Sequence, residues 1–122
     1  MICQKAVLVV EDETLIRMTA ADAIRDTGLE VFEAANAQQA IAILEERDDI
    51  GLLFTDIDMP GHMNGMELSF VVSDRWPPIS TVIASGKHSP GADDMPAEAS
   101  FYGKPYDADG VAQRICAMLA PA

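Results

Sequence analysis

Five short, mainly apolar runs alternate along this chain with segments whose apolar residues recur at helical spacing. The runs are the expected strands, 6–10, 30–34, 51–55, 81–84 and 100–103. Apolar runs of this length that end at turn-forming or charged residues are typical of strands buried inside a sheet. Strands separated by helical segments pair in parallel through crossover connections. We therefore expect an α/β fold, a doubly wound sheet of five parallel strands with helices on both faces.

The segments between these runs carry helix signals. Asn36, with Gln39 three residues later, is typical of a capping box at a helix start. Gly28 suits the left-handed residue that follows a helix. Asp107 is expected to cap the last helix, which turns Met118 inward. The apolar stripes of the four expected helices fall within 16–24, 37–44, 68–72 and 111–119.

Composition excludes several functional classes. The net charge of −12 argues against a nucleic-acid partner, because such proteins need a basic patch. No apolar run is long enough to span a membrane, and residues 1–5 are too short and polar for a signal peptide. Cys3 and Cys116 lie far apart and outside any CxxC pair, so neither a zinc site nor a disulfide framework is indicated. We expect one cytoplasmic domain over 1–122, with no membrane contact.

Polar residues stand where four of the expected strands end. They are Glu11, Asp12, Asp56, Ser85 and Lys104. Each alone has an ordinary explanation as a first-turn acid, a turn residue or a solvated charge, and Asp56 suits a turn as well as it suits a nucleophile or metal ligand. In open parallel sheets, however, ligands bind outside the carboxyl ends of the strands. The sequence therefore predicts one pocket with three or more carboxylates, a hydroxyl and a lysine.

The composition of this pocket restricts its chemistry. Clustered carboxylates repel one another unless a cation neutralises them, and an all-oxygen set suits Mg²⁺. A lysine and a hydroxyl suit the oxygens of a phosphoryl group. Together with a free carboxylate nucleophile, these groups indicate phosphoryl transfer to an aspartate. The chain lacks a glycine-rich phosphate loop, so nucleotide binding is not indicated.

The order and spacing of four motifs resemble the receiver domain of two-component response regulators over essentially the whole chain. The motifs are 7–13, 55–60 with Gly65, 83–86 and 101–106. The resemblance implies a flavodoxin-like sheet of order 2-1-3-4-5. It also implies phosphorelay signalling, in which a histidine kinase or histidine phosphotransfer protein donates the phosphoryl group. Contacts with a downstream protein target then change.

The resemblance assigns a role to each residue on the metal side of the pocket. Asp56 is implied as the phosphoacceptor and as a metal ligand. Asp12 resembles the direct ligand of the acidic pair, and Glu11 resembles the partner that holds Mg²⁺ through water. Asp58 is implied to contribute its backbone carbonyl.

The resemblance also assigns the phosphoryl side. Ser85 stands at the hydroxyl position that binds a phosphoryl oxygen, and Lys104 resembles the lysine that neutralises the phosphoryl charge. Pro105 follows where the family has a cis peptide, which proline makes accessible. Phe101 stands at the position of the aromatic switch, although an ordinary core aromatic would also suit it.

The chain departs from the family in two loops. The segment 60–65 is one residue longer than usual, and its His62 is expected to be solvated and outside the site. Lys104 follows Ser85 by only 19 positions, and 87–96 between them contains two prolines and a glycine. Because a proline inside a helix costs about 3 kcal/mol, the usual fourth helix is expected to be shortened or missing.

Two charged residues are expected at the rim of the pocket. Asp58 and Lys87 each lie two residues beyond a site residue. We expect them to approach each other across the mouth and to hinder the water that hydrolyses the phosphoaspartate. The alternative is a pair of independent solvated charges, which would contribute ~0–1 kcal/mol.

Two other functions remain open at this stage. Asp56-Ile57-Asp58 resembles the DxD motif of haloacid-dehalogenase-type phosphatases, which also use an aspartate nucleophile and Mg²⁺. A pseudo-receiver would bind partners without being phosphorylated. The receiver hypothesis predicts self-phosphotransfer and autodephosphorylation only, with no turnover of an external substrate.

Overall fold

Strands and helices alternate along the chain as expected. The structure is a computed structural model and describes residues 5–120. The elements are β1 (Ala6–Val10), α1 (Thr14–Arg25), β2 (Glu30–Ala34), α2 (Ala37–Glu46), β3 (Ile50–Asp56), α3 (Gly65–Arg75), β4 (Ser80–Ser85), a 3₁₀ turn (Ala92–Asp94), β5 (Ser100–Gly103) and α4 (Ala108–Leu119).

The five strands form one parallel sheet in the order β2-β1-β3-β4-β5. This order confirms the predicted doubly wound fold. Every residue of β1 and of β3 is buried, which explains why these runs are almost continuously apolar. Val10 lies opposite Thr55, and Asp56 lies opposite Ala84. The register therefore brings the carboxyl ends of the three central strands to the same edge.

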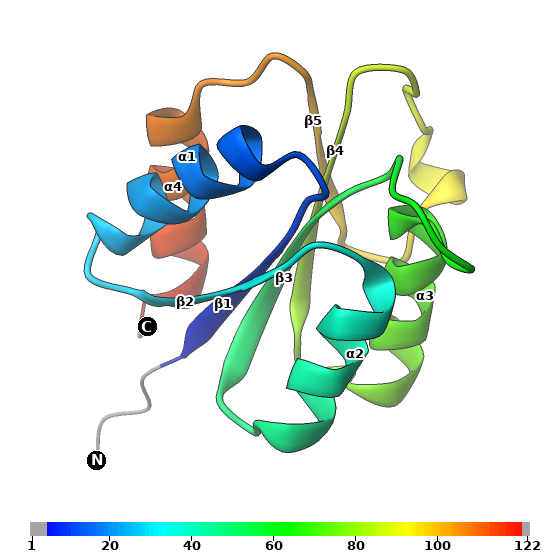
Figure 1. Ribbon diagram of the computed structural model, residues 1–122, viewed down its shortest axis with the longest axis horizontal. Helices are drawn as coiled ribbons and strands as arrows, with labels where there is room; N and C mark the ends of the chain where they lie inside the picture. Colours follow the sequence, from blue (N-terminus) through cyan, green and yellow to red (C-terminus); the bar gives the residue numbers. More distant parts are fainter. Residues whose placement is uncertain (1–4, 121–122) are drawn as a thin grey trace.

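Helices cover both faces of the sheet, with α1 and α4 on one side and α2 and α3 on the other (Figure 1). Alternate residues of β1 point to the two sides. Val7 and Val9 belong to the core beneath α1 and α4, whereas Leu8 and Val10 belong to the core beneath α2 and α3.

Side-chain caps fix the starts of α2 and α3. Asn36 Oδ1 accepts a hydrogen bond from Gln39 N at 2.8 Å, as expected, but Gln39 Oε1 accepts from Ala35 N and does not complete the box. The complete capping box lies at Asn64 and Glu67, at the start of α3. It anchors the helix that follows the loop after β3.

Two predictions for the last helix hold only in part. Asp107 is the N-cap residue of α4, but its side chain makes no cap hydrogen bond. Met118 is 38% exposed. The buried face of α4 is formed by Val111, Ala112 and Ile115. Leu119 in the last turn is partly buried and packs against the same core, so within the predicted stripe 111–119 it is Met118 that faces outward.

The usual helix between β4 and β5 is missing, as predicted. The segment contains only the 3₁₀ turn Ala92–Asp94, where Gly91 N donates to Asp94 Oδ2 at 3.0 Å. No described helix is long and apolar enough to cross a membrane. Cys116 is a free, half-buried thiol, and Cys3 lies outside the described residues.

Candidate functional site

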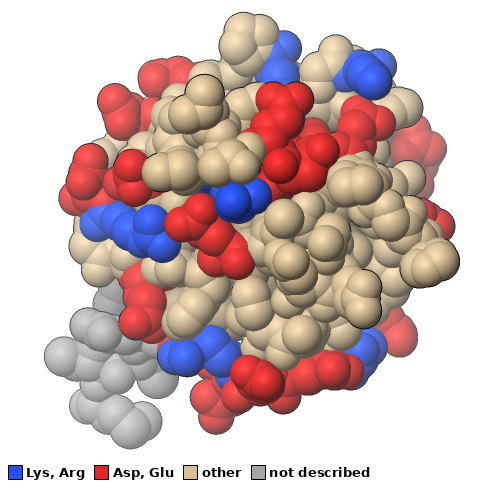
Figure 2. Space-filling view, viewed as in Figure 1, with Lys and Arg blue, Asp and Glu red and all other residues tan. Residues whose placement is uncertain are grey.

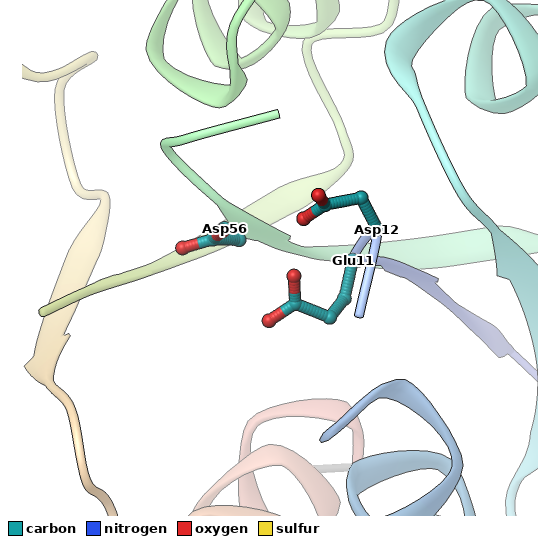
Figure 3. Close-up of side chains that lie close together, drawn as sticks. All are labelled: Glu11, Asp12 and Asp56. Carbon is teal, nitrogen blue, oxygen red and sulfur yellow. The ribbon is translucent and has the colours of Figure 1, made fainter. Parts of the chain in front are cut away.

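Three carboxylates meet at the edge of the sheet where β1 and β3 end. Glu11 and Asp12 follow β1, and Asp56 is the last residue of β3. Their nearest carboxylate oxygens all lie within 4.8 Å of one another (Figure 3). The convergence predicted from the strand ends is therefore present.

Lys104 connects two of these carboxylates. Its Nζ lies 2.6 Å from Glu11 Oε1 and 3.2 Å from Asp56 Oδ1. The backbone holds this lysine in place, because Lys104 N donates to Ser85 O at 2.9 Å. The peptide bond between Lys104 and Pro105 is cis, as the resemblance implies.

Burial makes the negative charges of this cluster costly. Glu11 is only 4% exposed and Asp56 only 7%. Burial raises the pKa of Glu11 from its usual 4.5 to about 7, against the lowering effect of Lys104. Burial also raises the pKa of Asp56, opposed by the charge of Lys104. Desolvation lowers the pKa of Lys104, but its hydrogen bond to Glu11 and the nearby negative charges outweigh this and raise it.

The donor set fits a hard divalent cation. Three carboxylates face one lysine, so the cluster keeps surplus negative charge, and all its donors are oxygen. Figure 2 shows Asp and Glu side chains gathered above the carboxyl ends of the strands. Asp12 is exposed, whereas Glu11 and Asp56 are buried, so a cation would approach from the Asp12 side. The contribution of the Asp58 carbonyl remains a prediction.

Ser85 and Asp58 lie at the mouth of the site, but Lys87 does not pair with Asp58. Ser85 Oγ is 3.5 Å from Asp58 Oδ2 and accepts hydrogen bonds from the backbone N–H groups of Lys87 and His88. The residue that reaches Asp58 is His88, with Nε2 3.1 Å from Oδ1. Lys87 is exposed and has no ion-pair contact with Asp58. The prediction for Lys87 is wrong by one residue, because the turn bonded to Ser85 directs the next side chain over the mouth.

Two aromatic residues flank Lys104 in the sequence, Phe101 before it on β5 and Tyr106 after it. Phe101 is half-buried on β5 and lies opposite Ile83 of β4, so its switching role remains a prediction. Tyr106 packs its ring against Phe54, with centroids 5.5 Å apart. Burial raises the pKa of Tyr106. His62 is exposed, as expected, and has no part in the carboxylate cluster.

Two contributors to the site escaped prediction from the sequence. Arg17 Nη1 donates to Glu11 O at 2.9 Å, and its Nε contacts Glu33 Oε1 at 3.2 Å. This links α1 and β2 to the acidic pair, although nothing in helical periodicity indicates such a contact. The other is the tight fit of Gly65, where an added Cβ would lie 1.7 Å from Asp56 O.

A mainly apolar groove of about 430 Å³ adjoins the site. One wall is α1, with Leu15, Ile16 and Thr19, and the other is the segment that begins at Lys104 and Pro105. The groove therefore shares Lys104 with the carboxylate cluster.

Known proteins resemble this chain throughout. The model of the response regulator receiver domain matches residues 7–110. A sensor kinase CckA from Brucella abortus is 32% identical over 117 residues, which are 93% of this chain and 12% of the kinase. An NtrX-like putative response regulator from Rickettsia bellii is 36% identical over 81 residues, which are 66% of this chain and 17% of the regulator. The chain thus spans less than a fifth of either relative.

Solved structures agree with these relatives. The CheY-like response regulator receiver domain protein from Methanospirillum hungatei JF-1 has a TM-score of 0.83 at 26% identity, covering 95% of this chain and 94% of that one. The receiver domain of the hybrid histidine kinase CckA has a TM-score of 0.78 at 32% identity, covering 94% and 99%. Together with the acidic cluster, the lysine and the sheet order, these matches show that the chain belongs to the response regulator receiver domains of two-component signalling systems.

Proposed function

We propose that this receiver domain accepts a phosphoryl group on Asp56 from a phosphohistidine partner, in a Mg²⁺-dependent reaction. The observation that carries the proposal is the contact of 3.2 Å between Lys104 Nζ and Asp56 Oδ1 beside two further carboxylates. It places a fixed cation where negative charge would gather during phosphoryl transfer.

The proposed reaction exchanges one bond to phosphorus for another. A carboxylate oxygen of Asp56 attacks the phosphorus, the P–N bond to the donor histidine breaks, and the imidazole that leaves takes up a proton. An acyl phosphate remains on Asp56. Lys104 would offset the charge of the phosphoryl oxygens, and Ser85 would donate its hydroxyl proton to one of them instead of to Asp58 Oδ2. Mg²⁺, held by Asp12, Asp56 and Glu11, would neutralise the remaining charge.

We further propose that the groove beside Lys104 receives the protein that carries the donor histidine. A donor must bring its histidine to Asp56, so its surface must cover what adjoins the site. Leu15, which lines the groove, is 79% exposed, and Met18 on the same helix is 47% exposed. Exposed apolar side chains of this size beside a reaction centre suit a partner interface. Leu15→Ser should slow phosphorylation by a histidine kinase that phosphorylates the wild type, and leave phosphorylation by acetyl phosphate unchanged.

Intact-mass measurement tests the central proposal. The protein is incubated with acetyl phosphate and Mg²⁺, and one added phosphoryl group is expected on the wild type but not on Asp56→Asn. Omitting Mg²⁺ or adding a chelator should abolish the gain. A wild type that never gains mass would favour the pseudo-receiver hypothesis instead.

The same experiment addresses catalysis on external substrates. We propose that turnover is limited to loss of the protein's own phosphoryl group. Asp58 is the second aspartate of the DxD motif on which the phosphatase hypothesis rests, and its carboxylate is held by Ser85 and His88. Rapid, repeated hydrolysis of phosphate esters would instead support the phosphatase hypothesis. Downstream protein contacts and a cytoplasmic location stay predictions from the sequence.

A further inference from the structure

The mouth of the site lies between two loops that begin side by side. Ile57 N, just after β3, donates to Ala84 O of β4 at 3.1 Å. The loop after β3 then carries Asp58, and the loop after β4 carries His88. Access to Asp56 between these two loops therefore depends on how they are joined.

A closed ring of hydrogen bonds joins them. His88 Nε2 lies 3.1 Å from Asp58 Oδ1, and Ser85 Oγ lies 3.5 Å from the other oxygen, Oδ2. The ring closes through the backbone, because His88 N donates to Ser85 Oγ at 3.0 Å. Both oxygens of one carboxylate thus contact the opposite loop. We call the pair of His88 and Asp58 the clasp.

The missing helix increases the importance of this contact. Beyond His88 the chain continues through Pro90 and Gly91 to a single 3₁₀ turn, with no helix to hold the start of the loop. Among the described side-chain contacts, the one that connects this loop to the loop after β3 is the clasp. The side chains of His88 and Asp58 are 54% and 40% exposed, so the clasp lies at the protein surface.

We propose that His88 is a positioning residue, which holds the clasp across the mouth and thereby lengthens the life of phosphorylated Asp56. In hydrolysis a water oxygen attacks the phosphorus and the bond from phosphorus to the Asp56 oxygen breaks. The carboxylate is regenerated and inorganic phosphate leaves with the protons of the water. A water that enters between the two loops must pass the clasp, so opening the clasp speeds this step. The inference rests on the proposed phosphorylation of Asp56.

The test measures the half-life of the phosphoryl group. Each protein is phosphorylated with acetyl phosphate and Mg²⁺, the donor is removed, and the loss of mass is followed. His88→Ala is expected to shorten the half-life about two- to fivefold, the change in population that an exposed pair produces. His88→Gln keeps a side-chain N–H of similar reach and should restore most of the half-life. Ser89→Ala, an exposed change in the same loop, is the matched control and should match the wild type.

Lys87→Ala separates the clasp from the rim contact that the sequence predicts. Equal half-lives in His88→Ala and the wild type would overturn the inference, as would a shortening in Lys87→Ala alone. Equal shortening in His88→Gln and His88→Ala would also overturn it, since a general disturbance of the loop would then explain the effect. A wild type that takes up no phosphoryl group would refute the proposed function itself, and the inference with it.

Discussion

Replacing Gly65 with alanine should move the phosphoacceptor. A Cβ at this position would lie 1.7 Å from Asp56 O and 2.6 Å from Asp56 C, whereas real Cβ contacts below 3.0 Å essentially never occur. Relief requires a shift of about 1.3 Å in the backbone of β3 or of α3, and neither is a flexible side chain. The hydrogen bond of 2.8 Å from Gly65 N to Ile57 O joins the same two segments, so a shift also weakens it.

The expected net loss of stability is about 1–3 kcal/mol. Overpacking a tight site costs roughly 1–3 kcal/mol, and a weakened buried hydrogen bond adds about 1 kcal/mol. Helix propensity acts in the opposite direction, since alanine is favoured over glycine in a helix by about 1 kcal/mol. The sign of the change therefore decides whether close packing or propensity dominates at the start of α3.

Urea unfolding followed by circular dichroism measures the stability of Gly65→Ala, and acetyl phosphate uptake measures the position of Asp56. Misplacing a reacting group by about 1 Å can cost on the order of a hundredfold in rate. Gly103→Ala is the matched control, because no atom lies within 4 Å of its added Cβ. If Gly65→Ala unfolds at the same urea concentration as Gly103→Ala and reacts at the wild-type rate, the packing argument is wrong.

Three further outcomes are expected. The folded chain keeps the Glu11 proton up to about pH 7, whereas the unfolded chain releases it near 4.5, so metal-free protein should lose up to roughly 3 kcal/mol as pH rises across that window. Urea unfolding in chelator should show this loss, and Glu11→Gln should flatten it. Lys104→Met should bind Mg²⁺ more tightly by calorimetry, because a competing positive charge is gone, yet lose phosphoryl uptake by intact mass. Asn64→Ala should lower the unfolding free energy by about 1 kcal/mol through the lost cap, whereas Asp107→Ala, which loses no cap bond, should change it little.

The residues that strands carry were predictable, because a parallel sheet brings strand ends to one edge. Asp56 and Lys104 lie where their apolar runs end. The register of the parallel strands then brings the two side chains into contact. His88 was not predictable, because its direction depends on a turn closed by Ser85 Oγ. Nor was the contact from Arg17 to the Glu11 carbonyl, which joins residues on different elements through a long, flexible side chain.

Close contacts between backbone segments also could not be predicted from the sequence. Gly65 was recognised as part of a motif, but the space that requires glycine is formed by the carbonyl of Asp56 and becomes evident only in three dimensions. Met118 shows the opposite failure. Helical periodicity places it on the inward stripe, but in the last turn of α4 it is Leu119 that packs against the core, and Met118 stays exposed. Periodicity predicts a direction, whereas burial depends on what packs opposite.

The features that suit this site to phosphoryl transfer also oppose folding of the metal-free chain. Burial at the strand ends raises the pKa of both Glu11 and Asp56, and one lysine faces three carboxylates. A cation that binds the folded chain and not the unfolded chain stabilises the fold by an amount that grows with its concentration. It follows that Mg²⁺ affinity and folding stability share one electrostatic origin. A substitution that relieves the crowding of charge, such as Asp56→Asn, should therefore raise the stability of the metal-free protein and reduce the further gain from Mg²⁺.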